Sequence, residues 1–121
     1  MYQVFERLRD SSLKVRRIAA MDAARVDVEG LLDQELEEWC EGLLARMGIE
    51  DDVRVFVRVI QALGEAGTEL VRREKQATWH KVLKQLHGLM DEPGTDIEVY
   101  HAALLARDGI EVAGRGLKRS V

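Results

Sequence analysis

The stretch "DDVRVFVRVIQALGEAG", residues 51–67, decides the fold class of this chain. Its valines alternate at positions 53, 55, 57 and 59, as they would in a half-buried β-strand. The chain offers no second convincing strand to pair with it, however, and a lone strand leaves its backbone groups unsatisfied. Asp51 or Asp52 can instead cap a helix. We therefore expect a helix whose apolar face consists of Val53, Phe56, Val57, Ile60 and Leu63.

The composition extends this expectation to the whole chain. Its 121 residues include one proline, few aromatic residues and many Ala, Leu, Glu and Arg, a mixture that favours helix. A chain of this length can bury a single core without disulfides, and the lone Cys40 excludes an internal one. The sequence predicts an all-α fold, with one bundle of about five helices over 1–108 and an irregular or mobile C-terminal tail over 109–121.

The sequence also predicts a cytoplasmic protein without a membrane span. The first ten residues, "MYQVFERLRD", carry charges where a secretory signal needs an apolar run. No stretch approaches the roughly 20 apolar residues of a membrane-spanning helix.

Capping residues suggest the helix boundaries in the N-terminal half. Ser11 and Ser12 interrupt a first amphipathic segment and offer an N-cap for its second part. A further helix ends at Gly48, where a helix C-cap favours glycine. Asp27 can start that helix, but "RVDVEG" contains no real stop, so one continuous helix through residue 27 is an open alternative.

Glycines and one loop set the boundaries expected in the C-terminal half. Gly64 and Gly67 bracket "GEAG", which is either a turn or a close-packing kink. A long helix over about 68–90 is expected to follow, and "DEPGTD", residues 91–96, is the clearest loop in the chain.

The last helix is expected to be short. Thr95 with Glu98 predicts a capping box at its start. Ile97, Leu104 and neighbouring residues give it a short apolar face, and Gly109 ends it.

The net charge of −4 is the sum of segments whose own net charges alternate in sign along the chain. Residues 25–52 hold ten acidic and two basic side chains, whereas residues 53–90 hold seven basic and three acidic ones. Residues 1–24 are basic overall and residues 91–121 acidic. These blocks either pair with one another inside the fold or face a partner, and the sequence leaves both alternatives open.

DNA binding is the main alternative function, because of the basic segment "RREKQATWHKVLKQLHGLM", residues 72–90. Two helices around a Gly-bearing turn within 53–90 are arranged as in a helix-turn-helix transcriptional regulator. The length of the second helix and the acidic net charge argue against this function. The residues that would contact nucleic acid are Arg72, Arg73, Gln76 and Lys84.

The histidines do not predict a metal site. His80 and His87 lie seven residues apart, which is about 10.5 Å along a helix, whereas metal–nitrogen bonds measure about 2.0–2.1 Å. His101 ends "EVYH", a Glu-x-x-His spacing used in di-iron bundles, but such a site needs a second copy of the motif and two further Glu. We expect neither a bound metal nor a cofactor.

The acidic segment "EEWCE", residues 37–41, resembles the EExxE half of a motif in all-α NTP pyrophosphatases of the MazG kind. In that family the Glu cluster and a downstream ExxD hold Mg²⁺ against phosphates, and clustered carboxylates are suitable Mg²⁺ ligands. The resemblance implies ligand roles for Glu37, Glu38 and Glu41 in an Mg²⁺-dependent hydrolase. The ExxD half is absent from the next helices.

The sequence favours an interaction module over an enzyme. Cys40 lies on an apolar stripe with no His nearby in sequence, so we expect a buried and unreactive thiol. We expect a protein partner, contacted through apolar helix faces and the acidic helix, as in an adaptor, chaperone-like factor or regulator. A symmetric homodimer is also expected. The predicted apolar contacts are Trp39, Leu43, Trp79, Leu83 and Leu86, and the sequence does not separate core from interface among them.

Overall fold

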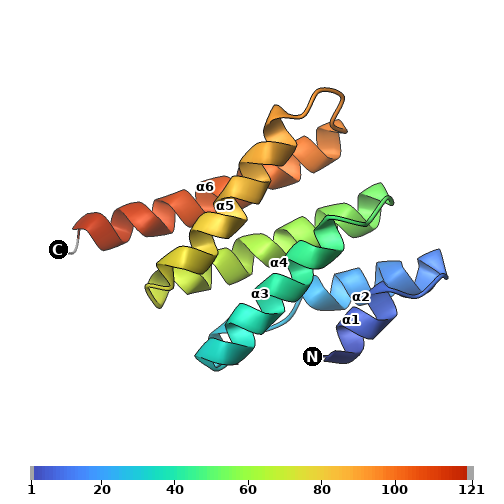
Figure 1. The fold of residues 1–121 in the computed structure, drawn as a ribbon, viewed down its shortest axis with the longest axis horizontal. Coiled ribbons are helices and arrows are strands. Elements are labelled where there is room, and N and C mark those ends of the chain that lie inside the picture. The colour runs from blue at the N-terminus through green and yellow to red at the C-terminus, as the bar shows by residue number, and fades with distance from the viewer. Residues whose placement is uncertain (1, 120–121) are drawn as a thin grey trace.

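The computed structural model describes residues 2–119, with side chains over 3–116, as a bundle of helices (Figure 1). No strand is present in this described part, so the all-α prediction is confirmed, including the helical reading of residues 53–60. None of these helices is long and apolar enough to cross a bilayer. The elements are α1 (Tyr2–Leu8), α2 (Leu13–Ala24), the 3₁₀ turn η1 (Val28–Gly30), α3 (Asp33–Met47), α4 (Val53–Arg72), α5 (Gln76–Asp91) and α6 (Ile97–Arg119).

Helix α4 forms the centre of the bundle and contacts α2, α3, α5 and α6 (Figure 1). Its valines do not alternate between two faces of a sheet. Val55, Val59 and Ile60 lie on one buried helical face, while Arg54 and Arg58 are exposed. The helical period therefore decides which side chains α4 buries.

The N-terminal boundaries agree with the capping residues. Ser12 caps α2, and its side chain accepts a hydrogen bond from the Val15 backbone N–H. Asp27 caps only η1, and α3 begins later, at Asp33. The segment between α2 and α3 is not α-helical, so the alternative of one continuous helix through residue 27 is wrong.

The predicted turn at "GEAG" is wrong, because α4 continues through both glycines to Arg72. A Cβ at Gly64 would lie 2.9 Å from the Ala106 Cβ, and one at Gly67 would lie 2.5 Å from the Ile110 side chain. These glycines let α6 approach α4 closely, which agrees with the alternative of a close-packing site. The actual reversal follows Arg72, where Glu74 has a positive φ of 59°.

The start of α6 differs from the predicted capping box. The Thr95 hydroxyl donates to the Leu89 and Glu92 carbonyl oxygens, at 2.9 Å from each. Asp96 is the capping residue, since its carboxylate accepts from the Glu98 backbone N–H at 2.8 Å. The predicted loop before it is confirmed.

Helix α6 does not end at Gly109 but runs on to Arg119. Residues 109–119 are therefore helical and not irregular as expected, while 120–121 lie outside the described residues. Contacts with α4 explain the continuation, because Ile110 is 1% exposed and lies against Gly67.

Candidate functional site

The apolar residues predicted to contact a partner fall into two groups. Trp39, Leu43 and Leu86 are fully buried and belong to the core. Trp39 packs against the Phe5 ring, with 5.0 Å between ring centroids. Trp79 and Leu83 are only half-buried at the edge of the core.

Trp79 and Leu83 line a cleft of about 840 Å³ between α5 and α6. The opposite wall comes from α6 and includes Ile110 and Gly114. A Cβ at Gly114 would meet nothing within 4 Å, so this wall is open. The sequence reading missed the wall, because it placed these α6 residues in an irregular tail.

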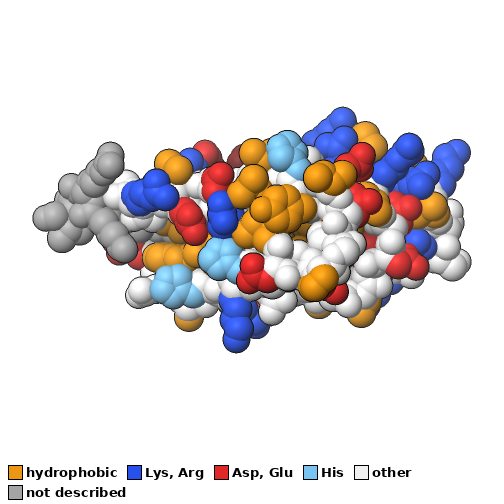
Figure 2. Space-filling model, turned by 90° about the horizontal axis from the view of Figure 1, so that it is seen from above, with side chains coloured by type: hydrophobic (Ala, Val, Ile, Leu, Met, Phe, Trp, Pro, Cys, Tyr) orange, Lys and Arg blue, Asp and Glu red, His pale blue; other side chains and the backbone are white. Residues whose placement is uncertain are grey.

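The rim of the α5–α6 cleft carries both signs of charge. Glu74, Gln76 and His80 line it on the α5 side, and Glu111 and Arg115 on the α6 side. Figure 2 shows the face seen from above, where hydrophobic side chains are interleaved with basic, acidic and histidine side chains. The cleft thus combines an apolar floor with a polar rim, as protein interfaces commonly do.

The residues predicted to contact DNA do not form the first turns of a recognition helix. Arg72 and Arg73 lie at the C-terminal end of α4. Gln76 starts α5 and lines the α5–α6 cleft, and Lys84 is exposed further along α5. The turn between the two helices lies at residues 73–75 and not at Gly64–Gly67, so the predicted placement of Arg72 and Arg73 on the second helix is wrong.

Arg73 instead holds the η1 segment against the end of α4. Its guanidinium donates to the backbone carbonyl oxygens of Val28, Glu29 and Leu31, at 3.2, 3.2 and 2.6 Å. It also pairs with Glu69 at 3.1 Å, and its side chain is 17% exposed. Burial opposes the charge on Arg73, but its acidic partners Glu69 and Asp33 outweigh it and raise the Arg73 pKa above its ordinary value. Arg73 is therefore engaged inside the fold.

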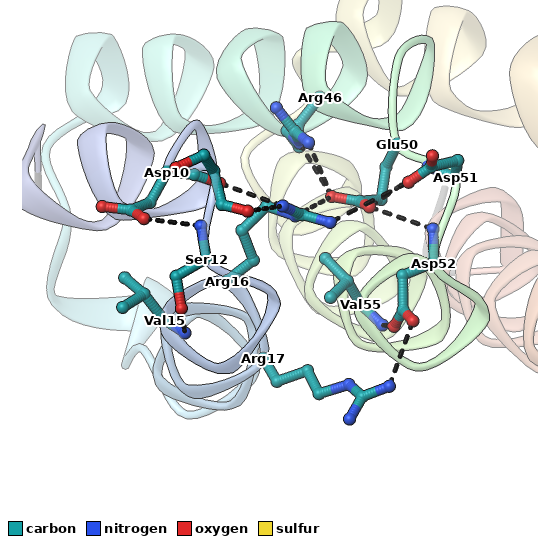
Figure 3. Close-up of polar contacts among 11 residues, drawn as sticks. Asp10, Ser12, Val15, Arg16, Arg17, Arg46, Glu50, Asp51, Asp52 and Val55 are labelled. Atoms are coloured by element: carbon teal, nitrogen blue, oxygen red, sulfur yellow. Dashed lines mark hydrogen bonds and ion pairs between the residues drawn. The ribbon is translucent and has the colours of Figure 1, made fainter.

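A second polar cluster joins α2, α3 and α4 around Glu50 (Figure 3). The Glu50 side chain is 0% exposed. Arg46 lies 2.6 Å from the Glu50 carboxylate, and Arg16 lies 3.4 Å from it. The other carboxylate oxygen of Glu50 accepts from the backbone N–H groups of Asp51 and Asp52. Glu50 thus fixes the α3–α4 connection against α2.

The surroundings of Glu50 favour its ionised form. Burial raises the pKa of a carboxyl group, and this is the largest single influence here. The Asp52 backbone N–H and the Arg46 and Arg16 guanidinium groups together outweigh it. The Glu50 pKa therefore lies below its ordinary value. Both carboxylate oxygens of Glu50 have partners within the chain, which indicates a structural role for this side chain.

The charge blocks of the sequence pair with one another in the fold. The acidic segment 25–52 supplies Glu50 and Asp52 to arginines of α2. The same segment supplies Asp33 to Arg73 and Glu41 to Lys81. Of the two alternatives left open by the sequence, internal pairing accounts for these contacts.

The acidic face of α3 does not assemble a metal site among the described residues. Glu41 binds Lys81 at 2.9 Å, and no group of three or more His, Cys, Asp or Glu side chains within the described part is placed to hold an ion. Glu37 and Glu38 lie on the same helix, and Glu38 accepts from Gln34.

Cys40 is fully buried, and burial raises its pKa to about 12. The thiol is therefore protonated near neutral pH, where only a thiolate would be a nucleophile.

Searches of protein-family models, curated proteins and solved structures find no match to this chain.

Proposed function

We propose that this protein is a helical interaction module that binds a protein partner in the α5–α6 cleft. The supporting observation is the pair Trp79 and Leu83, which remain half-buried on a wall of an 840 Å³ cleft. Tryptophan is among the residues that most often dominate interface energies, particularly when it can be desolvated by the partner.

The shape of the cleft favours an amphipathic helix as the bound segment. Its two walls are helices, and a third helix can place its apolar face between them. The mixed rim, with Glu111 and Arg115 on one wall, suits a partner segment that carries both charges around an apolar stripe. This cleft takes the place of the acidic helix face that the sequence suggested, because Glu41 is paired with Lys81.

Nucleic-acid binding has less support as an alternative. Arg73 is held by backbone carbonyls and acids of its own chain, and Arg72 pairs with Glu29 and Glu69. Lys84 alone does not form a basic stripe of the kind that binds a phosphate backbone.

Site-specific photocrosslinking tests the proposal. A photoreactive residue at Leu83 should capture a discrete protein in cells of the native host, whereas one at Ile49, which is 70% exposed and away from the cleft, should not. With the purified partner, Trp79→Ala should weaken binding by about 2 kcal/mol, roughly 30-fold. Ile49→Ala is the matched control and should leave Kd unchanged.

Two results would contradict the proposal. The first is equal capture at positions 49 and 83. The second is an unchanged Kd for Trp79→Ala when circular dichroism shows that the variant is folded.

A further inference from the structure

A second groove lies on a different face of α6 from the α5–α6 cleft. It is bounded by α2 and η1 on one side and α6 on the other, with α4 as its floor, and has a volume of about 720 Å³. A shallower hollow of about 390 Å³ continues it along α6 and shares Thr68, Arg72 and Gly109 with it. The α4–α6 groove, as we call the two together, follows α6 from Ala102 to Gly116.

The α6 residues along this groove alternate in spacing by three and four. They combine protruding apolar side chains with positions that have no side chain. Leu105 is 59% exposed and Val112 is 62% exposed, while Gly109 and Gly116 are exposed between and beyond them. A three-four spacing of apolar residues is the pattern by which two helices pack along a common seam. The stripe consists of Ala102, Leu105, Gly109, Val112 and Gly116.

Contacts within the chain do not account for Gly109 and Gly116. A Cβ at Gly109 would meet only the Thr68 hydroxyl at 3.7 Å, an ordinary contact, and one at Gly116 would meet nothing within 4 Å. This contrasts with Gly64 and Gly67, whose missing side chains are filled by α6. Glycine inside a helix is destabilising relative to alanine. A neighbouring backbone that must approach closely would offset this cost.

We propose that a second copy of this chain occupies the α4–α6 groove, with the two α6 helices antiparallel across a two-fold axis near Gly109. In this arrangement Leu105 of each copy lies opposite Val112 of the other. Gly109 of one copy faces Gly109 of the other near the axis, so the helix axes can approach closely. A two-fold interface uses the same patch on both copies, so one patch must supply both the knobs and the hollows. This stripe supplies both.

The charges around the groove agree with a second copy as the occupant. Arg25, Arg58 and Arg72 line it together with Asp27, Glu29 and Glu65, so basic and acidic groups are equal in number. Two like faces of this composition do not repel each other as two faces of one sign would. A strongly charged partner such as nucleic acid would find no complement. On the opposite wall, Met21 is 39% exposed and extends the apolar surface that the partner α6 would cover.

Sedimentation velocity with matched variants tests the proposal. The wild-type protein should sediment as a dimer, and Leu105→Glu should raise the dimer Kd at least 30-fold. Ile97→Glu places the same charge on the same helix, at a residue that is 79% exposed and outside the groove, and should leave the Kd unchanged. Both sites are exposed, and circular dichroism will verify that both variants fold.

A disulfide trap gives an independent readout of the geometry. Gly109→Cys should form a disulfide-linked dimer on oxidation, because the two positions face each other near the axis. Gly88→Cys on α5, where a side chain would meet nothing within 4 Å, should not. Cys40 is buried and will not interfere. A monomeric wild-type protein, a dimer unaffected by Leu105→Glu, or the absence of a Gly109→Cys disulfide in a dimeric sample would each overturn the proposal.

Discussion

Replacing Glu50 by glutamine tests the role of the buried carboxylate at the junction of α2, α3 and α4. The substitution keeps the size of the side chain and one oxygen that can accept the Asp52 backbone N–H. It removes the negative charge that faces Arg16 and Arg46, whose side chains are 15% and 13% exposed. Two mostly buried cations then face each other without their common partner.

The expected loss of stability follows from the burial of this cluster. Removing one partner of a buried ion pair costs about 3–5 kcal/mol, and a hydrogen bond to a charged group contributes about 1.5–3 kcal/mol. Because both arginines retain some access to water and glutamine keeps one acceptor, we expect Glu50→Gln to cost about 2–4 kcal/mol. The urea midpoint should fall by about 1–2 M, given a slope of roughly 2 kcal/mol per molar, the middle of the range for small proteins.

Urea unfolding followed by circular dichroism measures this loss, with Glu41→Gln as the control. Glu41 lies on α3, the helix before the segment that carries Glu50. It is paired with Lys81, but its side chain is 50% exposed, so its loss should cost no more than about 1 kcal/mol. Equal effects for the two variants would refute the assignment of Glu50 as a buried, paired carboxylate.

The pH dependence provides a second check on Glu50. Its pKa in the folded chain lies below its ordinary value, so ionised Glu50 stabilises the fold above the unfolded pKa. That contribution is lost as the pH falls through the folded pKa. The wild-type protein should therefore lose its advantage over Glu50→Gln as the solution is acidified from neutral pH, and a constant difference would contradict the reasoning.

Three further outcomes are expected. Gly64→Ala should lower the thermal midpoint, because its Cβ would lie 2.9 Å from an alanine of α6 and overpacking costs about 1–3 kcal/mol. Gly88→Ala has open space around it and should stabilise the protein by about 0.5–1 kcal/mol. The opposite order of thermal midpoints would contradict the close approach of α4 and α6. Native Cys40 should not react with a thiol reagent at pH 8, because burial raises its pKa to about 12, and should react fully in urea; rapid native labelling would show that it is accessible. Arg73→Lys should lower the free energy of unfolding by about 1–3 kcal/mol, because lysine lacks the forked donors that bind several carbonyls. It should also speed hydrogen exchange over 28–33. Arg72→Lys, at a side chain 58% exposed, should change neither the stability nor the exchange rates.

The helices were predictable where local signals and packing agree. Ser12 caps α2 as its residue type suggests. The apolar stripe predicted for α4 is correct at Ile60 and Leu63, which are fully buried, whereas Val53 and Phe56 are only half-buried. In each case the information lies within a few neighbouring residues. At 53–60 the sequence predicts a helix because a lone strand leaves its backbone unpaired, and the structure confirms the helix.

The sequence predicts the wrong role for several glycines, because the contacts that require a glycine come from a distant part of the chain. Gly64 and Gly67 favour a break when judged by local propensity, but α6 packs against the positions where their side chains would be. Gly109 was likewise expected to end α6, which continues because Ile110 and Ala106 are buried against α4. A single sequence does not show which distant helix will approach a glycine.

The site residues show the same limit. Trp39 and Trp79 both lie on apolar helical stripes, yet one is fully buried and the other half-buried in a cleft. Arg73 was assigned to DNA because its type suits base edges, but its acceptors are backbone carbonyls more than forty residues earlier. Periodicity identifies an apolar or basic face and does not identify what covers it.

The pairing of α4 with α6 also constrains how the chain folds as it is synthesised. Gly64 meets Ala106 and Gly67 meets Ile110, so α4 and α6 run in the same direction. Helix α5 carries the chain back from the end of α4 to the start of α6 (Figure 1). The hollow at Gly67 therefore stays unfilled until translation has passed residue 110. Nascent chains should accordingly expose the apolar side of α4 to chaperones and proteases through most of synthesis, and a premature stop before Ile110 should leave a polypeptide prone to aggregation.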